Sequence, residues 1–289
     1  MGRVSRIAFA FAIVLAAALV GASTSSAASS AASCRAESFD VWLDDFREEA
    51  AAQGISRRAI SAALTGIAYD AEVVARDRAQ GVFKQSFAQF AGRMISPYRV
   101  QKGASLLQRH AAVLDQVERR FGVPAPVVVA IWGLETDFGA NRGNVPTLTA
   151  LASLAYDCRR SAMFTNELLD ALRVVDRGDL SPAEMRGAWH GELGQTQFLP
   201  SSYVRFAVDF DGDGRADLIR SAPDVFASTA NYLKGYGWRR GEAWDEGTAN
   251  FEVIRQWNRS AVYARTVAAF AARLADGRTA ERDGKRRLP

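Results

Sequence analysis

Apolar positions recur with the period of an amphipathic helix through much of the chain. Ser38 precedes one such segment, FDVWLDDFR, and the stretch from Ala104 to Phe121 repeats the pattern as another helix. Glycine and proline fall between the helical segments, and no alternating run is long enough to build a large sheet. The sequence therefore predicts a mainly α fold.

One predicted helix, from Val127 to Phe138, begins with the apolar run VVVAIW and contains Glu135 near its end. Pro124 and Pro126 suit the first turn of this helix, and Gly139 suits its C-cap. Glu135 shares a helical face with apolar residues, so its carboxyl group loses water there. We therefore expect burial to raise the pKa of Glu135, which is what a general acid requires.

The more ordinary alternative is that Glu135 is a surface or ion-paired residue at the edge of an apolar helix. Asp137 can equally be a solvated charge in the following loop. On this stretch alone the ordinary alternative is favoured, and other segments change that balance.

A second segment, GELGQTQFLPSSY, combines glycines with neutral polar side chains. Gln195, Thr196 and Gln197 offer donors and acceptors of the kind that hold sugar hydroxyl and acetamide groups. The alternative is a polar turn before a helix that starts at Pro200. Near the C-terminus, Trp257, Asn258 and Tyr263 are typical of a sugar cleft and equally typical of a core.

The most specific pattern is the acidic segment DFDGDGRAD, which begins at Asp209. Acids at loop positions 1, 3, 5 and 9 with glycine at position 6 match a calcium loop. Position 12 is Arg220, so the closing ligand must come from elsewhere, and Asp224 is the best candidate. Without a cation the acids would repel one another, which disfavours a plain acidic turn. The predicted metal site comprises Asp209, Asp211, Asp213, Arg215 and Asp224.

The N-terminus has the order of a secretory signal peptide. Arg3 and Arg6 precede an apolar run, and small residues follow it. We expect residues 1–33 to be a signal peptide and spacer, since the run is shorter than the ~20 residues that span a bilayer. A lipid anchor at Cys34 is disfavoured because Ala31 stands where leucine is usual. A polar tail that frays is expected from Asp276 to Pro289.

Composition excludes several classes of function. The chain has 289 residues, 48% of them hydrophobic, and a net charge of +4 with acids and bases interspersed, so it carries no nucleic-acid footprint. Two cysteines and two histidines are too few to favour a zinc site or a Cys-His nucleophile, and no Gly-x-Ser-x-Gly elbow is present. In an exported chain, Cys34 and Cys158 are expected to form a disulfide.

Taken in order, these motifs resemble the lytic murein transglycosylase B family, glycoside hydrolase family 103. The matching segments are ETDFG from Glu135, GQTQFLPS from Gly194, DFDGDG from Asp209, ANYL from Ala230, and Trp257-Asn258. The resemblance implies a lysozyme-like catalytic domain with an additional helical domain, occupying residues 34–275. It also implies a periplasmic enzyme, acting as a monomer on peptidoglycan glycan strands, with wall-synthesis enzymes as possible partners.

The resemblance also implies roles for individual residues. Glu135 is similar to the family's single acid/base. The residues implied to line the sugar subsites are Gln197, Tyr232, Trp257, Asn258 and Tyr263. The calcium ion is expected to be structural, and no organic cofactor is implied.

The implied reaction cleaves the MurNAc-GlcNAc β-1,4 bond and forms a 1,6-anhydromuramyl end. Ordinary glycosidases use two carboxyl groups, whereas only Glu135 is placed in an apolar setting here. One alternative is a lysozyme-type hydrolase that uses Asp137 or Glu192 as a second carboxylate. The other is a non-catalytic protein that binds the cell wall.

Overall fold

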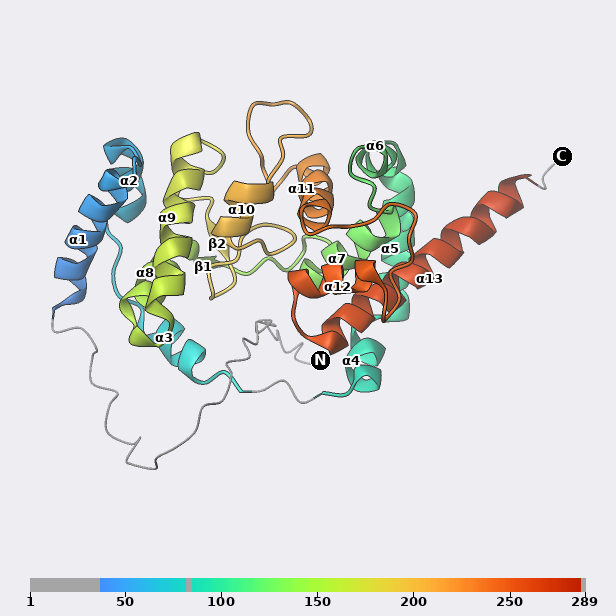
Figure 1. Ribbon diagram of the computed structural model, residues 1–289, viewed down its shortest axis with the longest axis horizontal. Helices are drawn as coiled ribbons and strands as arrows, with labels where there is room; N and C mark the ends of the chain where they lie inside the picture. Colours follow the sequence, from blue (N-terminus) through green and yellow to red (C-terminus); the bar gives the residue numbers. More distant parts are fainter. Residues whose placement is uncertain (1–36, 82–84, 287–289) are drawn as a thin grey trace, which may run out of the picture. The chain divides into compact units, whose positions relative to one another are not determined.

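The computed structural model describes residues 37–81 and 85–286, and these form thirteen α-helices, one 3-10 helix and two short strands (Figure 1). The mainly α prediction is confirmed. Two compact units divide the chain. Unit 1 comprises Met1–Val82, Gly143–Leu193 and Leu199–Val204, and unit 2 comprises Phe83–Arg142, Gly194–Phe198 and Arg205–Pro289. The predicted signal peptide and Cys34 lie outside the described residues.

In unit 1, α8 packs along α9, α3 packs on α8, and α2 packs on α9 (Figure 1). Its elements are α1 (Phe39–Ala52), α2 (Arg57–Leu64), α3 (Ala71–Arg78), β1 (Val145–Pro146), α8 (Thr147–Tyr156), η1 (Cys158–Arg160), α9 (Ser161–Arg177) and β2 (Arg186–Gly187). The strands pair antiparallel. Ser38 caps α1 as predicted, because its Oγ accepts a hydrogen bond from the backbone N–H of Val41.

A buried cluster of charges ties α3 of unit 1 to η1 and to the loop after β2. Asp77 is 1% exposed, and its carboxylate accepts hydrogen bonds from Arg159, at 2.7 Å, and from Arg160. His190 lies 3.5 Å from Asp77 and 3.5 Å from Glu192. Burial alone would raise the pKa of Asp77, but hydrogen bonds from His190 and the two arginines outweigh burial and hold it far below its usual range.

His190 responds in the opposite direction. Burial lowers the pKa of its imidazole, but hydrogen bonds to Asp77 and Glu192 outweigh burial and raise it above its ordinary value. The cluster therefore holds the imidazole of His190 beside two carboxylates that favour its protonated form.

In unit 2, α7 packs against α13, α5, α6 and α11. The elements of this unit are α4 (Phe87–Met94), α5 (Pro97–Arg109), α6 (Ala111–Phe121), α7 (Ala125–Thr136), α11 (Ala222–Gly235), α12 (Ala249–Trp257) and α13 (Ala261–Arg286). Helix α10 (Pro200–Phe206) begins at the predicted proline, and its last two residues belong to unit 2. None of the described helices is both long enough and apolar enough to cross a membrane.

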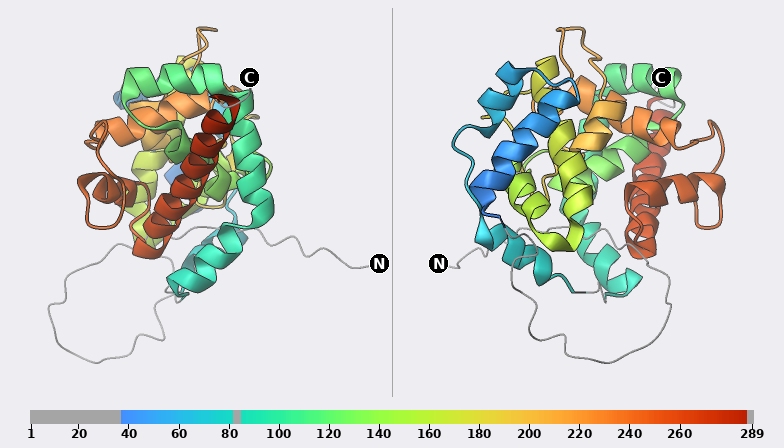
Figure 2. Two further views of the ribbon diagram at one scale, coloured as in Figure 1. Left: turned by 90° about the vertical axis from the view of Figure 1, so that its right-hand side faces the viewer. Right: turned by 60° about the vertical axis from the view of Figure 1, so that its left-hand side comes forward.

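The structure corrects two predicted elements of unit 2. The helix expected from Ala104 to Phe121 is two helices, α5 and α6, which run in different directions from a break at His110 (Figure 2). The His110 ring packs edge-on against Trp132 and Phe226, so tertiary packing determines the break.

The polar tail expected from Asp276 was also wrong in part. Helix α13 continues through Arg286. Three arginines with one alanine, one glutamate and one lysine favour a helix over residues 276–286, although two glycines do not.

The charge cluster predicts that unit 1 loses stability at both ends of the pH range. The pKa of Asp77 is lower in the fold than in the unfolded chain, so its contribution is present above about pH 4 and is lost as the pH falls. The pKa of His190 is raised, so its contribution is present below about pH 6.5 and is lost as the pH rises through the folded-state pKa.

Urea unfolding between pH 3 and pH 9 measures both effects. We expect His190→Gln to remove the alkaline loss and, since the imidazole also lowers the pKa of Asp77, to reduce the acid loss as well. Asp77→Asn should flatten both, since it also removes the carboxylate that raises the pKa of His190. If His190→Gln loses as much stability at alkaline pH as the wild-type protein does, this account is contradicted.

Candidate active site

Glu135 is the exception in an otherwise buried helix. Eleven of the twelve residues of α7 are buried, and Glu135 is half-buried near the C-terminal end. Its Oε1 accepts a hydrogen bond from the indole Nε1 of Trp257, at 2.9 Å, and another from the hydroxyl of Tyr263, at 2.6 Å. Trp257 ends α12 and Tyr263 lies in the first turn of α13, so three helices of unit 2 converge on this carboxyl group.

Tyr263 is 1% exposed and is fixed as a hydrogen-bond donor. Burial and the adjacent Glu135 raise the pKa of its hydroxyl well above the ordinary value, so the group keeps its proton. Asn258 and Ser260 shape the turn before it: Asn258 Oδ1 accepts from the Ser260 N–H at 3.0 Å, and Ser260 Oγ accepts from the Tyr263 N–H at 3.3 Å. This turn orients the start of α13.

Aromatic side chains surround Trp257. Its ring packs edge-on against Phe198 and Tyr232, with centroids 5.3 and 4.7 Å away. The Tyr232 hydroxyl donates to the carbonyl of Gln256 at 2.7 Å, and burial raises the pKa of this hydroxyl far above its usual range. Tyr232 therefore supports the ring of Trp257.

Three of the five residues expected to line the sugar subsites are buried, Tyr232, Asn258 and Tyr263. Tyr232 is 7% exposed and Asn258 is 6% exposed, and the hydrogen bonds just described link both side chains to backbone groups. The resemblance to the family implied a subsite role for each, but aromatic rings and amides also pack well in a core.

The segment from Gly194 to Phe198 meets the end of α7. Gln195 accepts from Trp132 Nε1 at 2.8 Å through its side chain, and its carbonyl accepts from the Thr136 hydroxyl at 2.5 Å. Gln197 is half-buried with a φ of 54°, and its amide donates to the carbonyls of Arg142 and Gly194. The sequence indicated polar groups here but gave no sign that Gln195 anchors Glu135's helix.

Both candidates for a second carboxylate already have partners. Asp137 lies between Arg99 and Lys102, with side-chain distances of 3.4 and 3.6 Å. Glu192 belongs to unit 1, where His190 Nδ1 lies 3.5 Å away, and its Oε2 is buried without a hydrogen-bond partner among the described residues.

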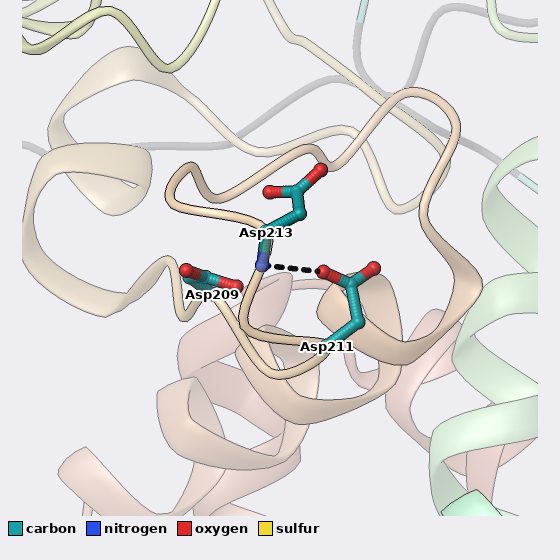
Figure 3. A group of neighbouring side chains, drawn as sticks. All are labelled: Asp209, Asp211 and Asp213. Atoms are coloured by element: carbon teal, nitrogen blue, oxygen red, sulfur yellow. Dashed lines mark hydrogen bonds between the residues drawn. The ribbon is translucent and has the colours of Figure 1, made fainter.

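The acidic loop brings three predicted metal ligands together (Figure 3). Asp209, Asp211 and Asp213 each offer a carboxylate oxygen, and these oxygens lie within 4.8 Å of one another. Across residues 37–81 and 85–286 this is the one group of three or more acidic, histidine or cysteine side chains close enough to share a cation. Hard oxygen donors at this spacing fit Ca²⁺.

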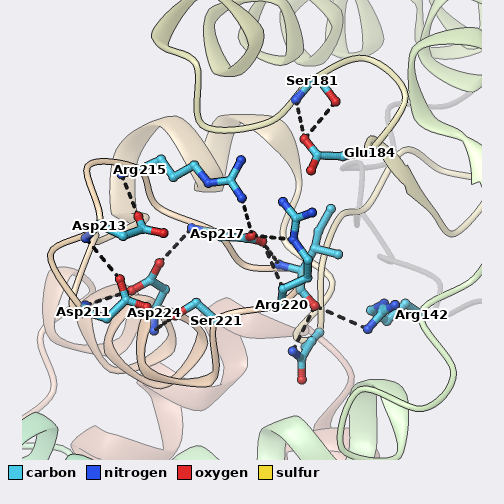
Figure 4. A network of polar contacts seen from close by, with 12 residues as sticks. Arg142, Ser181, Glu184, Asp211, Asp213, Arg215, Asp217, Arg220, Ser221 and Asp224 are labelled. Carbon is cyan, nitrogen blue, oxygen red and sulfur yellow. Dashed lines mark hydrogen bonds and ion pairs between the residues drawn. The ribbon is translucent and has the colours of Figure 1, made fainter.

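The other predicted ligands have different partners in the loop (Figure 4). Asp224 is fully buried and accepts from the backbone N–H groups of Phe210, Asp211 and Asp217, so it closes the loop through hydrogen bonds. The guanidinium of Arg215 donates to Asp217, so Arg215 can offer a cation only its carbonyl.

Arg220, at position 12 of the loop, also pairs with an acid of the same loop. Arg220 Nε donates to Asp217 Oδ2 at 2.8 Å, which neutralises the acid at position 9. Asp217, at position 9, is paired with both Arg215 and Arg220. Three carboxylates of the loop, those of Asp209, Asp211 and Asp213, therefore remain as donors for a cation.

Residues 38–249 match the family described as Transglycosylase SLT domain, and the chain belongs to this family. Over 158 residues the chain is 34% identical to the membrane-bound lytic murein transglycosylase B of Escherichia coli strain K12. That alignment covers 54% of this chain and 44% of the E. coli protein, so the chain spans less than half the length of this curated relative.

Solved structures share the fold. SltB3 from Pseudomonas aeruginosa, in complex with NAG-anhNAM-pentapeptide, matches with a TM-score of 0.77 at 33% identity over 81% of this chain and 79% of that chain. The E. coli lytic transglycosylase SLT35 in complex with calcium matches with a TM-score of 0.73 at 24% identity, over 82% and 93% of the two chains. At 24% identity the likeness supports the fold alone. The predicted lytic transglycosylase fold is confirmed.

The hydrogen bonds to Glu135 predict unequal effects of two matched substitutions. Tyr263→Phe removes a donor from the half-buried carboxyl group of Glu135, and we expect a loss of about 1–3 kcal/mol in the free energy of unfolding. Tyr232→Phe removes a donor from a neutral carbonyl, and the expected loss is about 0.5–1.5 kcal/mol. Urea denaturation of both variants measures the difference. Equal losses would contradict a stronger hydrogen bond at Glu135 than at the Gln256 carbonyl.

Proposed function

We propose that this chain is a peptidoglycan lytic transglycosylase that cleaves the MurNAc-GlcNAc bond and leaves a 1,6-anhydromuramyl end. The observation that carries the proposal is the Glu135 carboxyl group, fixed by Trp257 and Tyr263 at the end of a buried helix. Family membership and the glycan-peptide complex of SltB3 support peptidoglycan strands as the substrate.

Glu135 acts first as an acid and then as a base. Its protonated carboxyl group donates a proton to the glycosidic oxygen as the bond to the muramyl C1 breaks. The resulting carboxylate then accepts the proton of the muramyl C6 hydroxyl, and that oxygen attacks C1 to close the anhydro ring. The two donors on Oε1 hold the carboxyl group in one orientation through both steps.

The partners of the other acids support a mechanism with one carboxylate. The carboxylate of Asp137 is paired with Arg99 and Lys102. Glu192 is held beside His190 in unit 1. A hydrolase needs a second carboxylate to activate water or to attack the sugar, whereas ring closure by the C6 hydroxyl needs none.

The remaining site residues have different roles, which follow from how exposed each side chain is and what it contacts. Gln197 and Trp257 are half-buried, and we assign them to the sugar subsites. Tyr232 and Asn258 are buried, and we assign them to positioning, Tyr232 of Trp257 and Asn258 of Tyr263. Tyr263 acts on Glu135 directly.

The acidic loop is assigned a structural Ca²⁺. Asp209, Asp211 and Asp213 would hold the ion, and the ion would remove the repulsion among their charges. The calcium complex of SLT35 is consistent with this assignment. The carboxylates are committed to the ion and to backbone N–H groups, so the ion has no part in the chemistry.

The assignment to the cell wall implies an exported protein. We propose the periplasm as its location, with a disulfide between Cys34 and Cys158 and a monomeric enzyme as expected from the sequence. Wall-synthesis enzymes remain the candidate protein partners.

Glu135→Gln tests the proposed chemistry. Glutamine keeps an oxygen for Trp257 and Tyr263 but cannot donate a proton, so we expect a normal fold and a loss of turnover of at least ~10²–10⁴-fold. Mass spectrometry of muropeptides released from sacculi measures it, with Glu252→Gln on the exposed face of α12 as the control.

The products of the wild-type protein separate the alternatives. Anhydromuropeptides support the proposal, and products that have gained a water indicate a lysozyme-type hydrolase. Binding to sacculi with no release indicates a wall-binding protein. Near-normal release by Glu135→Gln would refute the role of this residue.

Calcium should raise the thermal stability of the wild-type protein. With three carboxylates and no bidentate ligand at position 12, we expect a Kd of roughly 10⁻⁵ to 10⁻³ M. At 100 times Kd the stabilisation is about 2.7 kcal/mol. Asp213→Asn keeps an acceptor for the Arg215 N–H but loses a charged ligand, so its melting temperature should respond less.

Asp245→Asn, an exposed acid outside the loop, is the matched control and should respond as the wild type does. The comparison is thermal unfolding with calcium and with chelator. If calcium does not change the melting temperature of the wild-type protein, the proposed calcium site is refuted.

A further inference from the structure

The backbone adopts an unusual conformation directly after Glu135. Asp137, Phe138 and Gly139 all have left-handed φ angles, of 53°, 60° and 82°. Among the described residues, Asp137 and Phe138 are two of three non-glycine residues with positive φ, and Gln197 is the third. L-residues in this region cost free energy, and such strain persists only where the surroundings hold it.

Two cations of α5 hold Asp137. Lys102 Nζ donates to the Asp137 carbonyl at 3.1 Å and lies 3.6 Å from its carboxylate, and Arg99 Nε donates to the carboxylate at 3.4 Å. Arg99 and Lys102 are three residues apart, so they project from one face of the helix. All three side chains are at least 72% buried, which limits screening by water.

Packing against neighbouring side chains holds Phe138 in place. Its ring is 8% exposed, meets Trp132 edge-on with centroids 5.4 Å apart, and lies 5.2 Å from Lys102 Nζ. Gly133 leaves the space for this ring: a Cβ at that position would lie 2.7 Å from it. The glycine inside an otherwise bulky apolar helix is thereby explained by the packing of the next turn.

We propose that Lys102 and Arg99 are positioning residues for Glu135, which act by holding Asp137 in its left-handed conformation. This inference rests on the proposed function of Glu135. Trp257 and Tyr263 fix the carboxyl group itself, whereas the clamp formed by Arg99, Lys102 and Asp137 fixes the backbone from which that side chain extends.

The clamp also gives Asp137 a role. Its charge is required to bind two cations, not to touch the substrate, so Asp137 is a positioning residue and not a second catalytic carboxylate. Loss of the clamp should move Glu135 while the sugar-binding groups of unit 2 stay in place. The expected kinetic effect is therefore on kcat and not on KM.

Asp137→Gly is the most informative variant. Glycine adopts a left-handed φ without strain, so the substitution removes the carboxylate with no steric penalty in the fold. We expect kcat on soluble muropeptide oligomers to fall by roughly 10- to 100-fold, since small displacements of a catalytic group have effects of this size. KM and the urea midpoint should stay close to wild type.

Lys102→Met and Lys102→Arg form a matched pair. Methionine keeps the apolar stem over Phe138 but removes the donor, so kcat should fall as in Asp137→Gly. Arginine restores a cationic donor and should recover most of the activity. Glu252→Gln removes an exposed ion pair with Arg255 in the same unit and should change nothing.

A second measurement does not depend on turnover. The Trp257 indole N–H donates to Glu135, so its ¹H-¹⁵N NMR resonance reports the position of the carboxyl group. It should shift in Asp137→Gly and Lys102→Met, return toward its wild-type position in Lys102→Arg, and stay unchanged in Glu252→Gln.

The outcomes separate the two proposals. An unmoved indole resonance, or an unchanged kcat in Asp137→Gly and Lys102→Met, overturns the clamp, and so does a kcat that falls only in proportion to the folded fraction. A wild-type protein that releases no anhydro products overturns the proposed function, and the indole resonance then still decides whether the clamp positions Glu135.

Discussion

Unit 2 is organised around one constraint, the placement of a carboxyl group in an apolar helix. A helix that is apolar on all faces must be surrounded, and α13, α5, α6 and α11 surround α7. Glu135 interrupts that surface, and a polar group there needs hydrogen-bond partners. Trp257 and Tyr263 supply them from the two helices that follow each other at the end of the unit.

The sequence predicted the parts of this arrangement that are local. Helical periodicity gave the fold class, and the proline, apolar run and glycine around Glu135 gave a buried helix ending near the correct residue. The donors lie 122 and 128 residues further along the chain, and no spacing rule connects them to Glu135. The resemblance to a family indicated Trp257 and Tyr263 as sugar-lining residues and gave no sign that they donate to Glu135.

The end of α7 and the partners of Asp137 could not be predicted from the sequence either, because they too depend on contacts between distant residues. Helix α7 ends at Thr136, two residues earlier than expected, because Asp137 and Phe138 turn left-handed before Gly139. Lone lysine and arginine residues in α5 give no sequence signal of a partner 35 or more residues away. Tertiary contacts can impose a backbone conformation that local propensity disfavours, and this is why helix ends are hard to read from sequence.

The ion pairs of unit 2 decide which of its carboxyl groups are available for chemistry or for a cation. Asp137 is paired with Lys102 and Arg99, and Asp217 is paired with Arg215 and Arg220. Asp209, Asp211 and Asp213 share no arginine or lysine partner among the described ion pairs, so a divalent cation is the natural way to balance their charge.

The same reasoning applies to unit 1, with a different result. Asp77, Arg159, Arg160, His190 and Glu192 form a buried network in which cations outweigh the desolvation of Asp77. Such networks add little net stability, since desolvation offsets most of the attraction, but removal of one member leaves a buried charge unpaired. Unit 1 therefore depends on the protonation state of a histidine, whereas unit 2 depends on donors that stay protonated at neutral pH. The pH dependence of stability and that of catalysis then arise from different residues, and each can be altered without the other.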